Sequence, residues 1–368
     1  MTETDAALVA DGPDEMGRDL AGSADVAEAT LAEVKRLRPR LDELFGRGSG
    51  AVLVGTGMSL AVAQAAAPFW LVARRRAGEQ PSLLIRESAS AALGSTDGRV
   101  WRAGDLVVAI SKSGTSPETV AAARGAAEAG CSVVAVTADP AAPLASLAEL
   151  VVPTPIGEEN GAGTRSAVAA LAALFAIPEG GTADPAARAV VVARLRAAVE
   201  SWAVVVPAGP RLASAARTWI VGFGTGVGLA QAAGILWHEK VRRPAVTLSV
   251  SEFRHGPIEA VCPGDAVIVV DADGPLPARA AYLELLRSEL EKLGAFVVWV
   301  SASSPPGVTS IRLNEGATAA APGEPSPAAA LEALVRLEQL ARATAHAART
   351  YRDGFAVLRT IVKPATGL

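Results

Sequence analysis

Cysteine, histidine and clustered basic residues are all scarce in this chain of 368 residues. The two cysteines, Cys131 and Cys262, stand in no CxxC or metal-ligand spacing, which excludes a disulfide scaffold and favours a reduced, cytoplasmic protein. The three histidines are too dispersed to predict a zinc site, and we expect neither a metal nor a cofactor. With a net charge of −4 and scattered lysines and arginines, nucleic acid is not an expected partner. A phosphate ligand would have to be held locally.

Membrane-directing features are also lacking. Residues 1–15 are acidic and have no apolar core of the kind that a signal peptide requires. Residues 51–73 carry no charge and are long enough to cross a bilayer, but they contain Gly55, Gly57 and Pro68. We interpret this stretch as a buried strand, a glycine turn and a helix, and we expect no membrane partner.

The chain contains an internal repeat. Residues 51–57 (AVLVGTG) resemble residues 218–224 (TWIVGFG), and residues 104–110 (GDLVVAI) resemble residues 264–270 (GDAVIVV). In each copy, short apolar runs alternate with helical patterns. Continuous apolar strands separated by helices are typical of a parallel sheet that is covered on both faces. The sequence therefore predicts an α/β fold with two tandem doubly wound parallel-sheet domains of flavodoxin-like type.

The predicted domain boundaries follow from this repeat. Residues 1–47 form a helical N-terminal arm, residues 48–205 the first domain and residues 206–345 the second. Residues 346–368 form a C-terminal tail that is apolar enough to dock on the body. Residues 305–327 are rich in Pro, Ala and Gly, and we expect them to run over the surface.

A polar turn follows the strand predicted at residues 106–110. Residues 111–119 (SKSGTSPET) precede a helix, where free backbone N–H groups and the helix dipole favour an anion. An ordinary N-cap needs one hydroxyl, whereas four occur here within six residues, which favours an anion site. The equivalent turn of the second copy, residues 271–275 (DADGP), carries two carboxylates that would repel a phosphate. Only the first domain is expected to bind one.

These motifs resemble the SIS (sugar isomerase) family over nearly the whole chain. The similar members are the isomerase module of glucosamine-6-phosphate synthase, the aminosugar-phosphate deaminases and the fructosamine-6-phosphate deglycases. Residues 110–119 match the family's phosphate loop, with Lys112 where many members have Gln. Residues 55–59 (GTGMS) match its Gly-x-Gly-Thr-Ser turn, residues 159–165 resemble the segment that closes over the sugar, and residues 251–257 (SEFRHGP) match its His-Gly-Pro box.

The resemblance implies catalytic roles for two residues. Glu239, sixteen residues before His255, stands where the relatives carry the base that moves a proton between C1 and C2. His255 stands where they carry the residue that opens the sugar ring, often from the neighbouring subunit of a dimer. Burial beside Trp237 would raise the pKa of Glu239 as such a base requires. On the residues alone, Glu239 could instead pair with Lys240 or Arg242 on a solvated face.

The resemblance also implies a set of substrate-binding residues. Near the C-terminus, however, this chain departs from the family's pattern. The expected binding residues are Ser59, Ser111, Lys112, Ser113, Ser116, Glu159, Thr164, Arg359 and Lys363. The synthase and the deaminases commonly have a C-terminal lysine where this chain has Arg359, which stays protonated and cannot form an imine. Lys363 stands four residues later, and Leu236 occupies a position where the synthase has lysine.

We therefore expect a homodimer with shared active sites that binds a hexosamine 6-phosphate. Proton transfer from C2 to C1 would give isomerisation, with deamination if the amine leaves as ammonia. If the nitrogen is acetylated, loss of the C3 hydroxyl makes the enzyme a dehydratase (a lyase), and if it carries an amino acid the reaction is deglycation. A non-catalytic phosphosugar sensor is the remaining alternative, which would need neither Glu239 nor His255.

Overall fold

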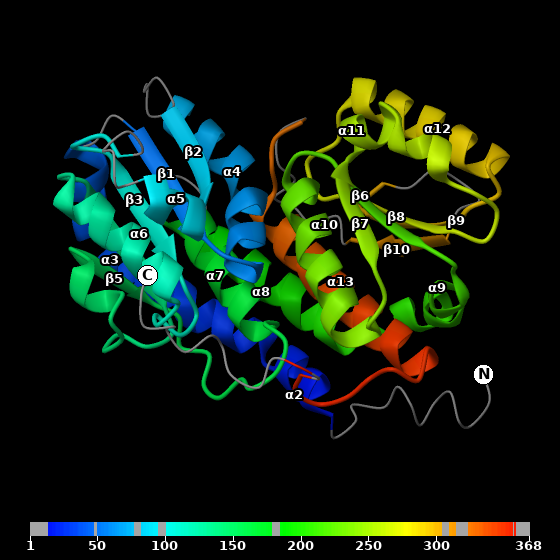
Figure 1. The fold of residues 1–368 in the computed structure, drawn as a ribbon, viewed down its shortest axis with the longest axis horizontal. Coiled ribbons are helices and arrows are strands. Elements are labelled where there is room, and N and C mark those ends of the chain that lie inside the picture. The colour runs from blue at the N-terminus through cyan, green and yellow to red at the C-terminus, as the bar shows by residue number, and fades with distance from the viewer. Residues whose placement is uncertain are drawn as a thin grey trace. The chain divides into compact units, whose positions relative to one another are not determined.

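The computed structural model describes residues 14–47, 50–76, 82–94, 101–178, 185–303, 309–313, 323–355 and 357. Its strands form two five-stranded sheets in which every pair is parallel (Figure 1). The first sheet has the order β2 (Ser82–Glu87), β1 (Gly50–Gly55), β3 (Leu106–Ile110), β4 (Ser132–Thr137), β5 (Leu150–Pro153). The second has the order β7 (Ala245–Ser249), β6 (Thr218–Gly222), β8 (Ala266–Asp271), β9 (Phe296–Ser301), β10 (Thr309–Arg312). Because both sheets share one strand order, the predicted α/β fold with two tandem doubly wound sheets is confirmed.

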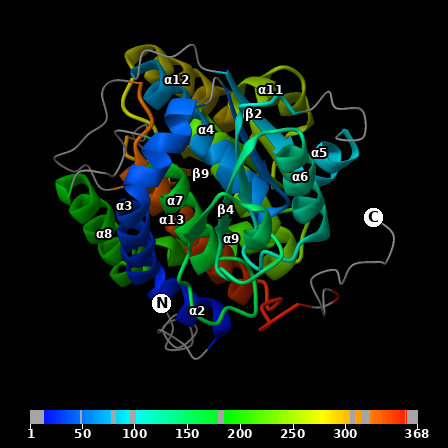
Figure 2. The same cartoon turned by 90° about the vertical axis from the view of Figure 1, so that its left-hand side faces the viewer.

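Helices cover both faces of the first sheet. On one face, α5 (Ser88–Gly94) and α6 (Pro117–Glu128) lie side by side (Figure 2) and pack small residues such as Ala91 and Ala122 against Val52 and Val107. On the other face, α4 (Met58–Arg76) packs against α7 (Arg165–Ala176). Burial on both faces explains why these strands are uninterrupted apolar runs.

The second sheet is covered in the same way. Helices α11 (Val250–Arg254) and α12 (Pro277–Lys292) cover one face, and the three buried leucines of α12 pack on Trp219, Val269 and Trp299. Each such leucine contributes roughly 1.5–3 kcal/mol to folding. On the other face lie α10 (Thr225–Leu236) and α13 (Pro327–Ala347), which pack against each other.

The remaining helices are α2 (Glu15–Ala21) and α3 (Ser23–Arg47), which precede the first sheet in sequence, and α8 (Pro185–Glu200) and α9 (Gly209–Ser214), which follow it. Shorter elements are a π-turn (Trp237–Val241) and the 3-10 turns Ala145–Leu147, Trp202–Ala208 and Pro257–Ala260. The prediction of a strand, a turn and a helix at residues 51–73 is confirmed by β1 and α4. Within the described part of the chain, no helix is both long and apolar enough to cross a membrane.

One expectation about the surface is wrong. Residues 309–312, within the stretch expected to run over the surface, form strand β10 at the edge of the second sheet. Ile311 is buried there, since its side chain faces the core from the last strand. The Pro- and Gly-rich composition around this short strand concealed it, because four residues give too little alternation to stand out.

The chain divides into two compact units that are not continuous in sequence. One unit contains the first sheet and comprises the described residues of Asp25–Glu159 and Arg165–Ala189. The other contains the second sheet, Val190–Phe355, together with Asn160–Thr164 and the described residues up to Ala24. The domain boundaries expected from the sequence remain a prediction.

Candidate functional site

The first sheet has a topological switch point between β1 and β3. From β1 the chain proceeds to β2 on one side, whereas β3, β4 and β5 follow on the other. In doubly wound sheets, ligands bind in the crevice outside the carboxyl ends of the strands at this point. The two loops that flank the crevice are residues 55–59, after β1, and residues 111–116, after β3. Both were singled out by the sequence.

The loop after β3 is fixed by its own backbone. Ser111 N–H donates to the Val136 carbonyl (3.1 Å), and the Lys112 carbonyl accepts from Ala138 N–H (2.9 Å). Gly114 has φ +64°, and a Cβ there would lie 2.5 Å from the Cβ of Ala142. Only glycine fits this position. The loop is therefore a rigid cradle rather than a free connection.

The hydroxyl groups of this loop leave donors for a ligand. Ser116 is the N-cap residue of α6, but its side chain makes no capping hydrogen bond and lies 3.1 Å from the Ser111 hydroxyl instead. Ser113 Oγ accepts from both the backbone N–H (3.2 Å) and the hydroxyl (2.9 Å) of Thr115. Ser113 therefore keeps its own proton to donate. The arrangement suits an anion at the N-terminus of a twelve-residue helix.

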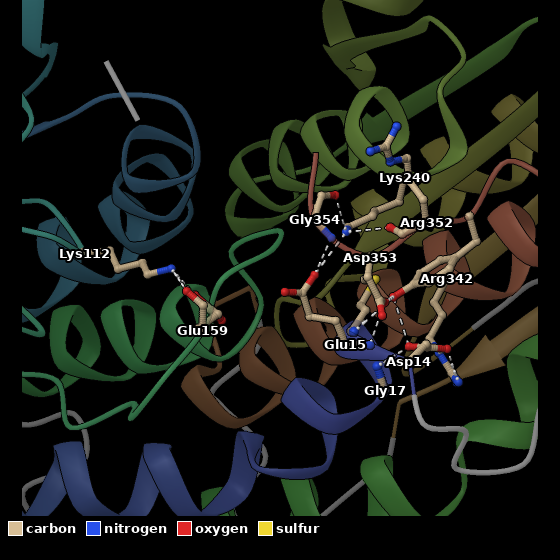
Figure 3. Close-up of polar contacts among 12 residues, drawn as sticks. Asp14, Glu15, Gly17, Lys112, Glu159, Lys240, Arg342, Arg352, Asp353 and Gly354 are labelled. Carbon is tan, nitrogen blue, oxygen red and sulfur yellow. Dashed lines mark hydrogen bonds and ion pairs between the residues drawn. The ribbon is translucent and has the colours of Figure 1, made fainter. Parts of the chain in front are cut away.

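Lys112 is held by another predicted binding residue. Its Nζ donates to the backbone carbonyl of Glu159 (2.6 Å) and forms an ion pair with the Glu159 carboxylate (3.1 Å) (Figure 3). The Glu159 side chain is fully buried and accepts from Ser166 N–H (3.1 Å) at the start of α7. The carboxylate thus fixes the ammonium group beside the loop and compensates its charge.

The other predicted binding residues are placed differently. Ser59 is partly exposed in the first turn of α4, next to the glycine turn after β1. Thr164 is fully buried and belongs to the compact unit of the second sheet. Arg359 and Lys363 lie outside the described residues. The structure therefore brings Ser111, Lys112, Ser113, Ser116 and Glu159 together in one unit.

The corresponding crevice of the second sheet contains the protein's own carboxylates. Burial raises the pKa of Asp271 to about 6 and also raises that of Asp273, and Arg279 contacts both (3.5 and 3.4 Å). Asp273 lies beside Thr225 at the start of α10, the place that an anion would take. A Cβ on Gly224 would lie 2.0 Å from the Asp273 carboxylate, so this turn fits tightly around it. Among the described residues, no group of His, Cys, Asp and Glu has the arrangement of a metal site.

Glu239 lies on the π-turn that continues α10. Its side chain is largely buried, and Oε2 has no hydrogen-bond partner among the described residues. Burial raises the pKa of Glu239 to about 7, while the charge of Lys240 opposes the rise. The expectation that desolvation raises this pKa is confirmed, and Trp237 beside it is fully buried. Glu239 and Lys240 do not form a solvated ion pair, because the Lys240 ammonium group donates to the carbonyl of Gly354 (3.1 Å).

His255 ends the short helix α11. Its backbone N–H donates to the Glu252 carbonyl (3.1 Å), and its ring is exposed. The helix is secured on both sides: Ser249 and Glu252 form a capping box, and Arg254 makes a bidentate pair with Glu289 (2.6 and 2.8 Å). The backbone thus presents the His255 ring to solvent from a fixed turn.

Two groups of polar residues went unnoticed in the sequence. At the end of β2, Glu87 accepts from Thr56 of the loop after β1 (3.3 Å), and the buried Ser88 hydroxyl lies 2.9 Å from that of Thr119 in α6. Polar residues directly after an apolar strand are a signal that would have identified the first group. The second group joins Glu15 to the π-turn and to residues 351–354, and no local pattern connects segments so far apart.

Comparison with known proteins identifies a family for part of the chain. The model of the SIS domain matches residues 93–177, which include the loop after β3. No curated protein sequence matches the chain. The fold is similar to that of the C-terminal domain of glucosamine-fructose-6-phosphate aminotransferase from Francisella tularensis (17% identity, 93% of this chain and 98% of that one, TM-score 0.73).

Two further solved structures show the same likeness. One is tagatose-6-phosphate ketose/aldose isomerase from Escherichia coli (19% identity, 90% and 92% covered, TM-score 0.77). The other is glucosamine-6-phosphate deaminase from Thermotoga maritima (18% identity, 86% and 93% covered, TM-score 0.61). These likenesses concern the fold of nearly the whole chain. The match to the SIS domain thus covers residues 93–177, and the likeness to these structures extends the similarity of fold to nearly the whole chain.

Proposed function

We propose that this protein is an enzyme that isomerises or deaminates a hexosamine 6-phosphate of the glucosamine 6-phosphate or N-acetylglucosamine 6-phosphate type. Names that refer to 6-phosphate sugars recur among the structures of similar fold, which supports a sugar-phosphate ligand. The rigid hydroxyl-lined loop at the switch point supports a place for the phosphate, on Ser111, Lys112, Ser113 and Ser116. Both cysteines are free thiols, which supports a cytoplasmic enzyme.

The observation that carries catalysis is the state of Glu239. A carboxyl group with a pKa of about 7 is half ionised near neutral pH, so that it can both take up and return a proton. Its Oε2 is buried and makes no hydrogen bond within the described structure, which leaves it available to a substrate. A sensor that only binds a phosphosugar has no use for such a group.

The proposed reaction has two stages. His255 transfers a proton from the anomeric hydroxyl to the ring oxygen, which breaks the ring C–O bond and leaves an aldehyde. Glu239 then takes the C2 proton, and the electron pair forms a C1–C2 double bond as the aldehyde oxygen gains a proton from water. Return of the proton from Glu239 to C1 converts the C2 amine into an imine, which is the isomerised product, and water hydrolyses this imine to the ketose with release of ammonia.

We further propose that the active enzyme is a homodimer in which His255 serves the site of the other subunit. The exposed ring on a secured turn supports this assignment, since a residue that acts within a partner has to be presented to solvent in the single chain. Thr164, Arg359 and Lys363 remain proposed substrate contacts on the strength of the resemblance.

Elimination of water from an N-acetylated hexosamine 6-phosphate is the second candidate. The state of two lysines supports it: Lys112 is held by Glu159, and Lys240 is fully buried and donates to backbone carbonyls. Neither ammonium group is placed to form an imine with the substrate. Loss of the C3 hydroxyl after removal of the C2 proton needs no imine.

The test is exchange of the substrate C2 hydrogen in deuterated water, followed by NMR with a panel of hexosamine 6-phosphates. The wild type should exchange this hydrogen at least as fast as it forms product. Glu239→Gln should keep its affinity for the substrate and lose turnover by a factor on the order of 100 or more. The product identifies the reaction. Exchange at the wild-type rate in Glu239→Gln would remove Glu239 from the mechanism.

A further inference from the structure

A fully buried cation stands next to the proposed base. Lys240 follows Glu239 on the π-turn, and none of its side-chain surface is exposed. A buried ammonium group destabilises a protein unless oxygen atoms compensate its charge. The Lys240 Nζ donates to the backbone carbonyls of Arg352 (3.2 Å) and Gly354 (3.1 Å), and the Glu15 carboxylate lies 3.8 Å away (Figure 3). All three of these acceptors come from segments far from Lys240 in sequence.

Glu15 joins these segments to one another. Its carboxylate accepts from the backbone N–H of Gly354 (2.7 Å), and its own backbone N–H donates to the carboxylate of Asp353 (2.8 Å). The first residue of α2 and the segment after α13 therefore meet at one point, with the Lys240 ammonium group between them (Figure 3). We call Glu15, Lys240, Arg352, Asp353 and Gly354 the terminal cluster.

Asp14 secures the terminal cluster from the side of α13. Its carboxylate pairs with Arg342 (2.7 Å), contacts His346 Nε2 (3.0 Å) and accepts from the Tyr351 hydroxyl (3.0 Å). Burial opposes ionisation, but the hydrogen bonds from His346 and Arg342 hold the pKa of Asp14 far below its ordinary value. The rings of His346 and Tyr351 stack at 4.4 Å. The Asp14 carboxylate is therefore ionised at neutral pH and held in place by Arg342, His346 and Tyr351.

The charges near Glu239 can be assigned to particular elements. Helix α10 contributes none, because the residues of Thr225–Leu236 are all uncharged. The titratable side chains on or beside the π-turn are His238, Lys240 and Arg242. Helix α13, which packs against the turn, carries Glu332, Arg336, Glu338, Arg342 and His346. The segments at and near the terminal cluster carry Asp14, Glu15, Arg18 and Asp19 on the side of α2, and Tyr351, Arg352 and Asp353 after α13. The charge of Lys240 favours the ionised carboxylate of Glu239 and so opposes the effect of burial.

We propose that Lys240 is a positioning residue for Glu239, and that the Glu15 carboxylate weakens the effect of the Lys240 charge on Glu239. Lys240 docks both chain segments of the terminal cluster on the π-turn, and its charge limits how far burial suppresses ionisation of the neighbouring carboxyl group. Glu15 compensates part of that charge and so acts on Glu239 in the opposite sense. The effect of this coupling on catalysis rests on the proposed function. The coupling of Lys240 and Glu15 to Glu239 does not, because it requires no substrate.

The coupling predicts shifts of opposite sign. Lys240→Met removes the cation, so the ionisation midpoint of Glu239 should rise by about half a pH unit or more. Glu15→Gln removes the compensating anion, so the midpoint should fall. Lys240→Arg keeps the charge and should stay near the wild type. Loss of packing alone cannot produce opposite shifts, because it would act in one direction in both variants.

The experiment is a titration of the Glu239 side-chain carboxyl carbon by NMR in the full-length protein labelled at glutamate. The signal is assigned by its absence in Glu239→Gln. Exposed residues provide matched controls: Lys292→Met and Glu259→Gln should leave the midpoint unchanged. Circular dichroism checks the fold of each variant, and if Lys240→Met fails to fold, Glu15→Gln and Lys240→Arg still carry the test. C2 exchange across the same pH range should move with the midpoint, with kcat affected more than KM.

The outcomes separate the two proposals. An unchanged midpoint in folded Glu15→Gln and Lys240→Met, or shifts of the same sign, overturns the role of Lys240 even if Glu239→Gln is inactive. Opposite shifts together with full activity of Glu239→Gln support the coupling and overturn the proposed function instead. A midpoint in Lys240→Arg that equals that of Lys240→Met would also contradict the proposal, because it would mean that the charge has no effect.

Discussion

Burial of the Glu239 carboxyl group makes the stability of the unit that contains the second sheet depend on pH. Below pH 4.5, the ordinary pKa of glutamate, this group is protonated in the folded and the unfolded chain alike. As the pH rises toward 7 the unfolded chain ionises first, so stability decreases up to the folded pKa of about 7 and then stays level. The difference between the two pKa values corresponds to about 3 kcal/mol at 1.4 kcal/mol per pH unit, and partial exposure reduces it to about 2 kcal/mol.

Replacement of Glu239 by Gln removes this penalty. The variant should match the wild type in stability near pH 4 and exceed it by about 2 kcal/mol at pH 8, a difference of roughly 4–8 °C in Tm for a unit of this size. Thermal melts at the two pH values measure the effect, and Glu259→Gln, at an exposed position, is the matched control that should show no such dependence. A Tm difference that stays constant from pH 4 to pH 8 would refute the inferred pKa.

Three further predictions concern the binding loop, the dimer and the tail. Replacing Ser111 and Ser113 together with Ala removes hydrogen bonds to a dianion that are worth roughly 1.5–3 kcal/mol each, so calorimetry should show affinity for glucose 6-phosphate about 100-fold weaker or worse. Asp273→Asn should leave it nearly unchanged, and equal losses would contradict a single phosphate site. Mixing inactive Ser111/Ser113 and His255→Ala variants should restore activity in hybrid dimers, and no recovery after proven subunit exchange would place His255 in its own subunit's site. Lys363→Ala should reduce activity only mildly if the reaction needs no imine, whereas complete loss would assign the amine to Lys363.

The fold was largely predictable because its determinants are local. The runs at residues 106–110 and 267–270 are apolar throughout, as strands buried on both faces must be, and glycine turns mark where helices begin. Strand β10 was not predictable, since Thr309–Arg312 alternates over only four residues and lies within a Pro- and Gly-rich stretch. Its burial depends on pairing with β9, which is a tertiary effect.

The candidate site was predictable where residues that act together are close in sequence. The hydroxyl groups of residues 111–116 share one turn, and the raised pKa of Glu239 follows from its apolar neighbours on one helical segment. The pairing of Lys112 with Glu159 and of Lys240 with Glu15 was not predictable, because an ion pair between distant segments leaves no periodic trace in either. The sequence offered Glu239 as a partner for Lys240, and the structure supplies backbone carbonyls instead.

The discontinuous composition of the two units has a consequence for how the chain can be divided. The unit with the second sheet takes Asp14 and Glu15 from one end and residues 350–354 from the other, so ribosomal synthesis delivers its pieces at widely separated times. A fragment that starts at Val190 would keep every strand of the second sheet and still bury Lys240 without its anion. A fragment of residues 25–189 contains all five strands of the first sheet and both partners of the Lys112–Glu159 ion pair, and the one foreign segment in it is residues 160–164. The two units therefore differ in how far they can be separated: the unit with residues 111–116 lies almost entirely in one continuous stretch, whereas the unit with Glu239 needs segments from before and after that stretch.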